Sequence, residues 1–215
     1  MASSASSASA SPLRFGPFDV STQVFYTTPL SFALVNLKPL LPGHVLVCPR
    51  QPHRRLTDLD PDELADLFGA VQTVQRMLAA HFFRDPDHSH NHDLIHTGGG
   101  FNIAVQDGPD AGQTVPHVHV HVIPRIHGAT AKDTTTDGDA LYEQMAAEPG
   151  NVGGAQWDAA ADASIGSRPK PGGRFPHIED SNRKPRSMAE MEAEAAVFRK
   201  LLTQQTRLEQ DSKQP

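Results

Sequence analysis

The sequence predicts a single α+β domain: an antiparallel β-sheet accompanied by one long helix and a C-terminal helix. Three patterns lead to this expectation. Apolar runs separated by turn residues lie before residue 50, apolar residues at helical spacing begin after Asp60, and histidine alternates with valine near residue 120. With 215 residues, of which 38% are hydrophobic, the chain can bury one core of ordinary domain size but hardly two.

Composition narrows the classes of protein to be considered. No run approaches the roughly 18 consecutive apolar residues of a membrane span, and a formal charge of −6 argues against a general polyanion-binding surface. We therefore expect no membrane partner and no nucleic acid. The single cysteine, Cys48, can form neither an internal disulfide nor a Cys-rich zinc site, which fits a reducing compartment. The expected location is the cytoplasm, with the nucleus as an alternative.

The first half of the chain predicts two paired strands and a helix. Residues 1–12 are nearly all Ala and Ser and predict a disordered tail. Strands are expected at Phe32–Val35 and His44–Cys48, joined by the turn residues of Lys38–Gly43. Asp60 can cap a helix that ends near His81. Its apolar positions recur at helical spacing: Leu64, Leu67, Phe68, Val71, Val74 and Leu78.

The middle of the chain predicts a loop and two further strands. Residues 85–100 mix histidine with Asp, Asn, Ser and Gly and predict a loop. Phe101–Gln106 alternates as a half-buried strand, so Gln106 should point away from the core. After a turn at residues 107–112, a strand is expected over Thr114–Pro124.

The last part of the chain predicts an excursion from the core and a return to it. The core is expected to span residues 13–127, followed by a flexible low-complexity segment over 128–182. A helix over 183–203 should belong to the core, because Ser187 and Glu190 form a capping box before an apolar face. Residues 204–215 predict a polar tail.

The run His117–Val122 carries the strongest chemical signal. In a strand its three imidazoles share one face, while the three valines enter the core. His117 and His121 would lie about 13 Å apart, too far to bind one metal ion together, although two neighbouring imidazoles could share one. A row of imidazoles suits an extended anion such as a polyphosphate. One of them could also be a nucleophile, because neutral imidazole attacks phosphorus without a separate base.

These residues closely resemble the histidine triad (HIT) family, whose signature His-φ-His-φ-His-φ-φ is met by His117–Ile123. The similarity reaches the fragile histidine triad branch, the dinucleoside polyphosphate hydrolases. The segments that carry it are Leu30–Asn36, Pro42–Pro49, Gln106–Pro109, Ala111–Val115 and Met191–Ala196. It covers roughly residues 13–125 and 186–202 and implies the HIT fold.

The resemblance also implies roles for individual side chains. His119 would be the nucleophile, His121 would contact the phosphate oxygens that are displaced, and His117 and His44 would flank the site and tune its orientation and charge. The transferases of the superfamily have Gln at the position of His121, so histidine favours hydrolysis. The substrate-binding residues implied are Asn36 for ribose, Gln106 for phosphate and leaving group, Phe18 near the base, and the phosphate loop of Gly112, Gln113, Thr114 and Val115.

The activity implied by the resemblance is the asymmetric hydrolysis of diadenosine tri- or tetraphosphate to AMP plus ADP or ATP. It would pass through a covalent adenylyl-histidine in a homodimeric enzyme. A divalent cation, Mg or Mn, would accompany the substrate, and no structural metal is expected. Two alternatives stay open: a ligand-bound signalling module with slow turnover, and a nucleoside phosphoramidase of another HIT branch.

Overall fold

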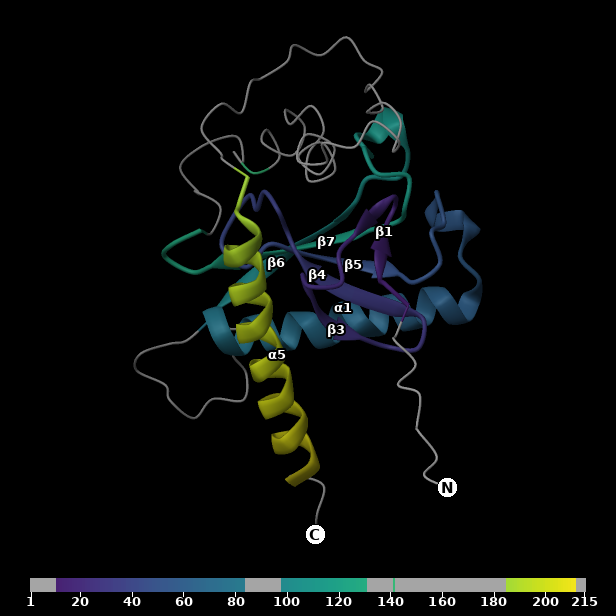
Figure 1. Ribbon diagram of the computed structural model, residues 1–215. Coiled ribbons are helices and arrows are strands. Elements are labelled where there is room, and N and C mark those ends of the chain that lie inside the picture. Colours follow the sequence, from purple (N-terminus) through teal and green to yellow (C-terminus); the bar gives the residue numbers. More distant parts are fainter. Residues whose placement is uncertain (1–10, 84–97, 131–140, 142–184, 212–215) are drawn as a thin grey trace, which may run out of the picture.

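The computed structural model describes residues 11–83, 98–130, 141 and 185–211 (Figure 1). Its main feature is a five-stranded antiparallel sheet in the order β3-β4-β5-β7-β6. These strands are β3 (Val24–Thr27), β4 (Ser31–Val35), β5 (Val45–Pro49), β6 (Gly99–Val105) and β7 (Val120–Ile126). The remaining elements are the hairpin strands β1 (Arg14–Phe15) and β2 (Phe18–Asp19), the short 3₁₀ turns η1 (Leu56–Asp58) and η2 (Pro109–Ala111), and the helices α1 (Pro61–Phe82) and α5 (Met188–Asp211). The predicted α+β class is confirmed.

Both helices pack on the same face of the sheet. α1 contacts β4, β5 and β7, and α5 contacts β3, β4 and α1 (Figure 1). Val118, Val120 and Val122 lie in the core between the sheet and these helices. The opposite face carries a second apolar cluster that joins the β1–β2 hairpin to β4 and β5. The alternation of histidine and valine therefore places the histidines on the face away from the helices.

Helix α1 begins and ends close to the predicted residues. Asp60 Oδ1 accepts the Glu63 N–H at 2.8 Å, and Glu63 Oε2 accepts the Asp60 N–H at 3.1 Å. This reciprocal pair satisfies two of the backbone donors left over at a helix start. Leu67 and Leu78 are buried as expected, but Leu64 and Phe68 are 40% and 38% exposed, so the predicted apolar face was too wide.

Helix α5 confirms the capping box but not the predicted bounds of the helix, because it begins at Met188 and not at residue 183. Ser187 Oγ accepts the Glu190 N–H at 3.3 Å, and the Glu190 carboxylate accepts the Ser187 N–H at 2.7 Å. The prediction of a polar tail from residue 204 was wrong, because α5 continues to Asp211. Residues 204–211 contain no Gly or Pro and are rich in good helix formers, so no residue in this stretch stops the helix.

Several predicted segments differ from the strands that form. The short strands β1, β2 and β3 were not predicted, because strands of 2 to 4 residues offer too little alternation to detect. The expected strand over Thr114–Pro124 begins only at Val120. The Val118 N–H donates to the His53 carbonyl at 2.8 Å, so the chain before Val120 is held by a loop and not by a neighbouring strand.

The other predicted boundaries lie largely outside the described residues. Of the N-terminal segment 1–12, only Ser11 and Pro12 are described, and both are exposed. Most of the loop predicted at 85–100 and of the excursion at 128–182 falls outside the described ranges. Within the excursion, Leu141 is described and is 3% exposed.

Candidate active site

His119 offers a nitrogen that carries no proton. Its Nδ1 lies 2.8 Å from the His117 carbonyl oxygen. Because a carbonyl only accepts hydrogen bonds, Nδ1 carries the proton, and Nε2 of the neutral ring keeps its lone pair. Nε2 is buried and has no hydrogen-bond partner among the described residues. Buried polar atoms are nearly always paired, so an unpaired lone pair here indicates an atom kept available for a ligand.

His117 is a structural member of the cluster, because both of its ring nitrogens are used. Nε2 donates to the Pro49 carbonyl at 2.8 Å, and Nδ1 accepts the Gly16 N–H at 3.0 Å. The ring is fully buried and lies 5.7 Å from the Phe15 ring, centroid to centroid. The sequence pattern suggested a row of three imidazoles facing a ligand; the structure leaves ring nitrogens available only on the second and third. His117 acts on the site through its carbonyl, which orients His119.

His121 presents an N–H donor to the site, where His119 presents a lone pair. The Leu40 N–H donates to His44 Nδ1 at 3.0 Å, and His44 Nε2 lies 3.0 Å from His121 Nδ1. Because His44 Nδ1 accepts a hydrogen bond, the proton of the neutral His44 ring lies on Nε2, which donates to His121 Nδ1. The proton of His121 is thereby fixed on Nε2. This atom is also buried and without a hydrogen-bond partner in the described parts of the chain.

The histidines of the triad are held neutral by burial. Removal from water lowers the pKa of His117 to about 4, lowers that of His119, and places that of His121 well below 6.5. The rings of His119 and His121 lie 5.0 Å apart. The triad therefore pairs a lone-pair nitrogen with an N–H donor at neutral pH, with none of its three rings charged.

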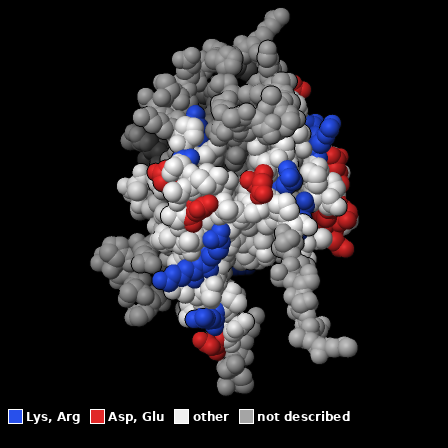
Figure 2. Space-filling view, viewed as in Figure 1, with Lys and Arg blue, Asp and Glu red and all other residues white. Residues whose placement is uncertain are grey.

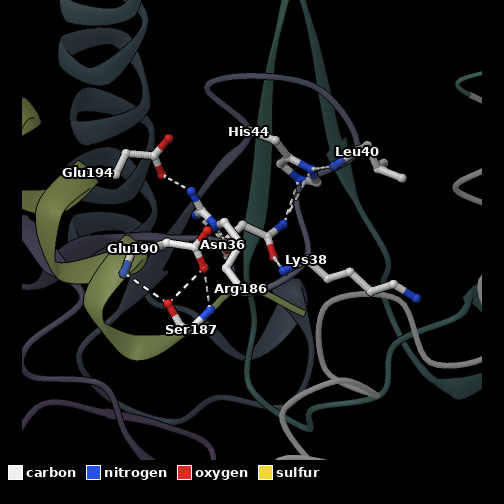
Figure 3. A network of polar contacts seen from close by, with 8 residues as sticks. All are labelled: Asn36, Lys38, Leu40, His44, Arg186, Ser187, Glu190 and Glu194. Atoms are coloured by element: carbon white, nitrogen blue, oxygen red, sulfur yellow. Dashed lines mark hydrogen bonds and ion pairs between the residues drawn. The ribbon is translucent and has the colours of Figure 1, made fainter. Parts of the chain in front are cut away.

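Asn36 contacts His44 from the loop that follows β4 (Figure 3). Its Oδ1 accepts the Lys38 N–H at 2.9 Å, which orients the amide, and its Nδ2 lies 3.3 Å from both ring nitrogens of His44. Asn36 is fully buried. The structure places this amide as a second donor beside His44 Nδ1, and the expected contact with ribose stays a prediction.

Gln106 follows β6 directly and lies against Gly112. A Cβ added to Gly112 would sit 2.8 Å from Gln106 Nε2, and Gly112 has φ of +90°, a conformation that side chains disfavour. His121 pairs with Ala104, two residues before Gln106, so Gln106 continues the face that carries His121. The amide and the loop at Gly112 are therefore neighbours.

Two backbone N–H groups of the expected phosphate loop are hydrogen-bonded within the loop, and its contact with phosphate stays a prediction. The Gly112 N–H donates to the Pro109 carbonyl at 2.9 Å and the Gln113 N–H to the Gly108 carbonyl at 3.0 Å, so these donors serve the loop itself. Gln113 Nε2 donates to the Arg54 carbonyl at 3.0 Å. The other predicted substrate-binding residues are buried as well: Thr114, Val115 and Phe18, of which Val115 and Phe18 belong to the second apolar cluster.

The charged side chains on the described surface are mixed in sign. On the face shown in Figure 2, both basic and acidic residues lie along and beside α5, and acidic residues gather at the right-hand edge of the view. Among the described residues no group of three His, Cys, Asp or Glu side chains is arranged to hold a metal ion. None of the helices in the described ranges is long and apolar enough to cross a bilayer.

The fold and the site define a class of protein whose active site is a buried pair of histidines on one face of a sheet. One ring presents a lone pair and the other presents an N–H. The family model described as the HIT domain matches residues 18–128, a little over half of the chain. The chain therefore belongs to the HIT domain family, which confirms the resemblance drawn from His117–Ile123.

Named relatives agree with this assignment. The chain is 42% identical over 183 residues to a bis(5'-nucleosyl)-tetraphosphatase (asymmetrical) of Schizosaccharomyces pombe, covering 85% of this chain and 90% of the relative. It is 43% identical over 140 residues to a bifunctional bis(5'-adenosyl)-triphosphatase/adenylylsulfatase of Arabidopsis thaliana, covering 65% and 67%. The fold matches the crystal structure of Plasmodium falciparum diadenosine triphosphate hydrolase, with a TM-score of 0.55 and 24% identity over 91% of this chain and 87% of that one.

Sequence reasoning missed the groups that fix the histidine tautomers. These are backbone groups: the Leu40 N–H, the Pro49 carbonyl, the Gly16 N–H and the His117 carbonyl. Backbone donors leave no residue-type signal, except that Gly16 adopts φ of +57° and its Cβ would lie 2.5 Å from Val115 Cγ1.

Proposed function

We propose that the protein hydrolyses dinucleoside polyphosphates such as diadenosine triphosphate or tetraphosphate, giving AMP plus ADP or ATP. The observation that supports this proposal most strongly is a pair of buried nitrogens: the lone pair of His119 Nε2 lies beside the N–H of His121 Nε2. The relatives named as asymmetrical tetraphosphatase and triphosphatase support the substrate class.

The two nitrogens divide the reaction between them. His119 Nε2 attacks the α-phosphorus and forms a P–N bond, while the bond from that phosphorus to the bridging oxygen breaks. His121 Nε2–H donates to the departing oxygen, where charge grows in the transition state. The His117 carbonyl accepts from His119 Nδ1 and stabilises the positive charge that the ring gains on attack. Water then cleaves the P–N bond, releases AMP and restores neutral His119.

The remaining residues serve orientation and binding. His44 holds the proton of His121 in place, and Asn36 supports His44. Gln106, packed over Gly112, would contact the phosphates and the leaving group, a role supported by its place on the face of His121. The roles of Asn36 at ribose and of Phe18 near the base rest on the resemblance to the family.

Hydrolysis of diadenosine triphosphate in heavy-oxygen water tests this proposal. Attack at the α-phosphorus puts the label in AMP and none in ADP, because water attacks only the α-phosphorus that is bound to His119 in the intermediate. Label in ADP would contradict attack at this position. Absence of any cleavage over a panel of dinucleoside polyphosphates would contradict the hydrolase itself, and a long-lived bound complex would then favour the signalling module.

We propose that Mg or Mn reaches the site on the polyphosphate and not as a resident ion. The protonation of the site supports this view, because His121 Nε2 carries a proton and only His119 Nε2 presents a lone pair, and no group of three ligand side chains lies together in the described ranges. Elemental analysis of the purified protein is expected to find less than one zinc, manganese or magnesium per chain. One tightly held ion per chain, lost with activity in His121→Ala, would contradict it.

We also propose that two copies of the chain pair through β6. This strand lies at the edge of the sheet, and its Ile103 side chain is 38% exposed between the half-buried Phe101 and Val105. An exposed edge with apolar residues is a template for pairing. Light scattering should show a dimer for the wild type and a shift towards monomer for Ile103→Lys; a monomeric wild type would contradict the pairing. The cytoplasmic or nuclear location stays a prediction, testable by imaging the tagged chain.

A further inference from the structure

Arg186 links helix α5 to the loop that holds His44 (Figure 3). It lies immediately before the capping residue Ser187, 65 residues after His121 in the sequence. Its Nε donates to the Asn36 carbonyl at 3.0 Å, and its Nη2 donates to the same oxygen. Its backbone N–H donates to the Leu37 carbonyl at 2.9 Å. One residue therefore fixes two successive carbonyls of the loop.

The other side of the guanidinium is anchored on α5. Arg186 Nη1 lies 2.7 Å from Glu194 Oε2, and the two side chains are 18% and 24% exposed. Arginine suits this task, because its planar group can bond a carbonyl and a carboxylate at once in a fixed geometry. A half-buried pair of this kind is screened less by salt than a surface pair.

The loop held by Arg186 supplies the two donors that set the His44 proton. These donors are the Asn36 amide, at 3.3 Å from Nδ1, and the Leu40 N–H, at 3.0 Å. The His44 proton in turn fixes the proton of His121 on the nitrogen that faces the site. A shift of the loop by a fraction of an ångström would weaken each of these hydrogen bonds in sequence.

We propose that Arg186 is a positioning residue for the proton donor of the active site, acting through Asn36, Leu40 and His44 on His121. This inference rests on the proposed function, in which the N–H of His121 donates to the oxygen of the leaving group. It predicts that helix α5 controls the donor nitrogen, His121 Nε2, and leaves the nucleophile, His119, in place. His119 is oriented from the other side, by the carbonyl of His117.

The test compares Arg186→Gln with a matched variant, Arg199→Gln. Arg199 also fastens α5 to backbone carbonyls, those of Val24 and Thr22 at 2.7 to 3.0 Å, but it bonds β3 and the residue before it, not the Asn36 and Leu37 carbonyls that Arg186 holds. Each variant is assayed with diadenosine triphosphate and with aryl esters of AMP whose leaving phenols rise in pKa. Thermal unfolding is measured for both variants.

We expect Arg186→Gln to lower kcat about 10-fold with little change in KM, since small misplacements of a catalytic group cost one to two powers of ten. The loss should grow with the pKa of the leaving phenol, because the missing function is hydrogen-bond donation to the leaving oxygen. In a His44→Gln background the same change should have almost no further effect. Arg199→Gln should lose stability but keep kcat and its dependence on the leaving group.

Nitrogen-15 spectra of the histidines give a readout that does not depend on turnover. The wild type should show His121 protonated on Nε2 only, and Arg186→Gln should show a mixture of the two tautomers. Equal kcat in both arginine variants, or unchanged tautomers in Arg186→Gln, would overturn the positioning role. If the wild type shows this tautomer pattern but cleaves no dinucleotide, the proposed function fails and the positioning inference stands or falls on the Arg186→Gln spectra. Should Arg186→Gln not fold, Glu194→Gln weakens the same link and must shift the leaving-group dependence in the same direction.

Discussion

At the scale of single residues, the backbone assigns different tasks to chemically identical side chains. His117, His119 and His121 are three imidazoles in one short run, yet one is structural, one offers a lone pair and one offers a proton. The difference comes from which nitrogen meets a carbonyl and which meets an N–H. Residue type alone could predict a cluster that reacts with phosphate, but it could not predict which histidine is structural, which offers the lone pair and which offers the proton.

Replacing the nucleophile should separate binding from turnover. His119→Asn removes the attacking nitrogen but keeps a side chain that can bond the His117 carbonyl. We expect kcat to fall by several powers of ten, as for other essential nucleophiles, while the affinity for diadenosine triphosphate changes little. Steady-state kinetics and equilibrium binding of the purified variant measure both quantities. Full activity in this variant would contradict the assignment of His119.

The acid limb of the pH profile reports the state of His119. Attack needs the neutral ring, and burial lowers the pKa of His119 below the ordinary value of 6.5. Activity should therefore persist below pH 6.5 and fall only at lower pH, as the ring gains its proton. The profile of kcat/KM measures this pKa in the free enzyme. His127→Gln, which removes an exposed histidine beyond β7, should leave the limb unchanged; a limb above pH 6.5 would contradict a neutral buried nucleophile.

At the scale of elements, long periodic segments could be predicted and short ones could not. Helix α1 starts at Pro61 as expected, because the caps and the apolar spacing agree. The start of β7 was misplaced, since the alternation of His117 to Val122 continues through residues that pair with no strand. Contacts across 68 to 101 positions of sequence hold His117 at the start of this run, and no local pattern encodes them.

Gly112 tests the packing of the loop against Gln106. Gly112→Ala places a Cβ 2.8 Å from Gln106 Nε2 at φ of +90°, so both the backbone and the amide must move. We expect kcat/KM to fall about 10-fold or more, together with a loss of about 1 to 2 kcal/mol in the free energy of unfolding. Gly69→Ala is the control, because nothing lies within 4 Å of its added Cβ in α1. That variant should be neutral or stabilised, and an equal loss in both would contradict the packing.

At the scale of the whole molecule, the two faces of one sheet have different roles: one face packs the core that stabilises the fold, and the other carries the site. The face that packs on α1 and α5 holds an apolar core, and the other face holds the histidines beside the β1–β2 hairpin. Alternation in sequence could predict this division, because it needs only the period of a strand. The contribution of Arg186 could not be predicted, since its partner carbonyl belongs to Asn36, 150 residues away.

The buried neutral histidines should make the fold less stable in acid. Unfolding returns the pKa of His117 from about 4 to the ordinary 6.5, and those of His119 and His121 also rise. Below pH 6.5 these histidines therefore bind protons in the unfolded chain but stay neutral in the folded chain. The free energy of unfolding falls as the pH falls. Each histidine contributes up to about 1.4 kcal/mol per pH unit.

Urea unfolding at pH 7.5, 6 and 5 measures this loss of stability. The wild type should lose stability steadily between pH 6.5 and 5. His119→Asn should show a shallower dependence on pH, because one of the three groups is gone. Stability that is constant or rises over this range would show that the histidines are charged or exposed in the folded protein.

The central claim is that His119 Nε2 forms a covalent bond to the α-phosphorus. The stereochemical course at that phosphorus tests it most directly, with a substrate made chiral at the α-phosphate and hydrolysed in heavy-oxygen water. Attack by His119 inverts the phosphorus once and attack by water inverts it again, so the account predicts net retention in the AMP released. Net inversion would mean that water attacks the substrate directly, and would contradict the account.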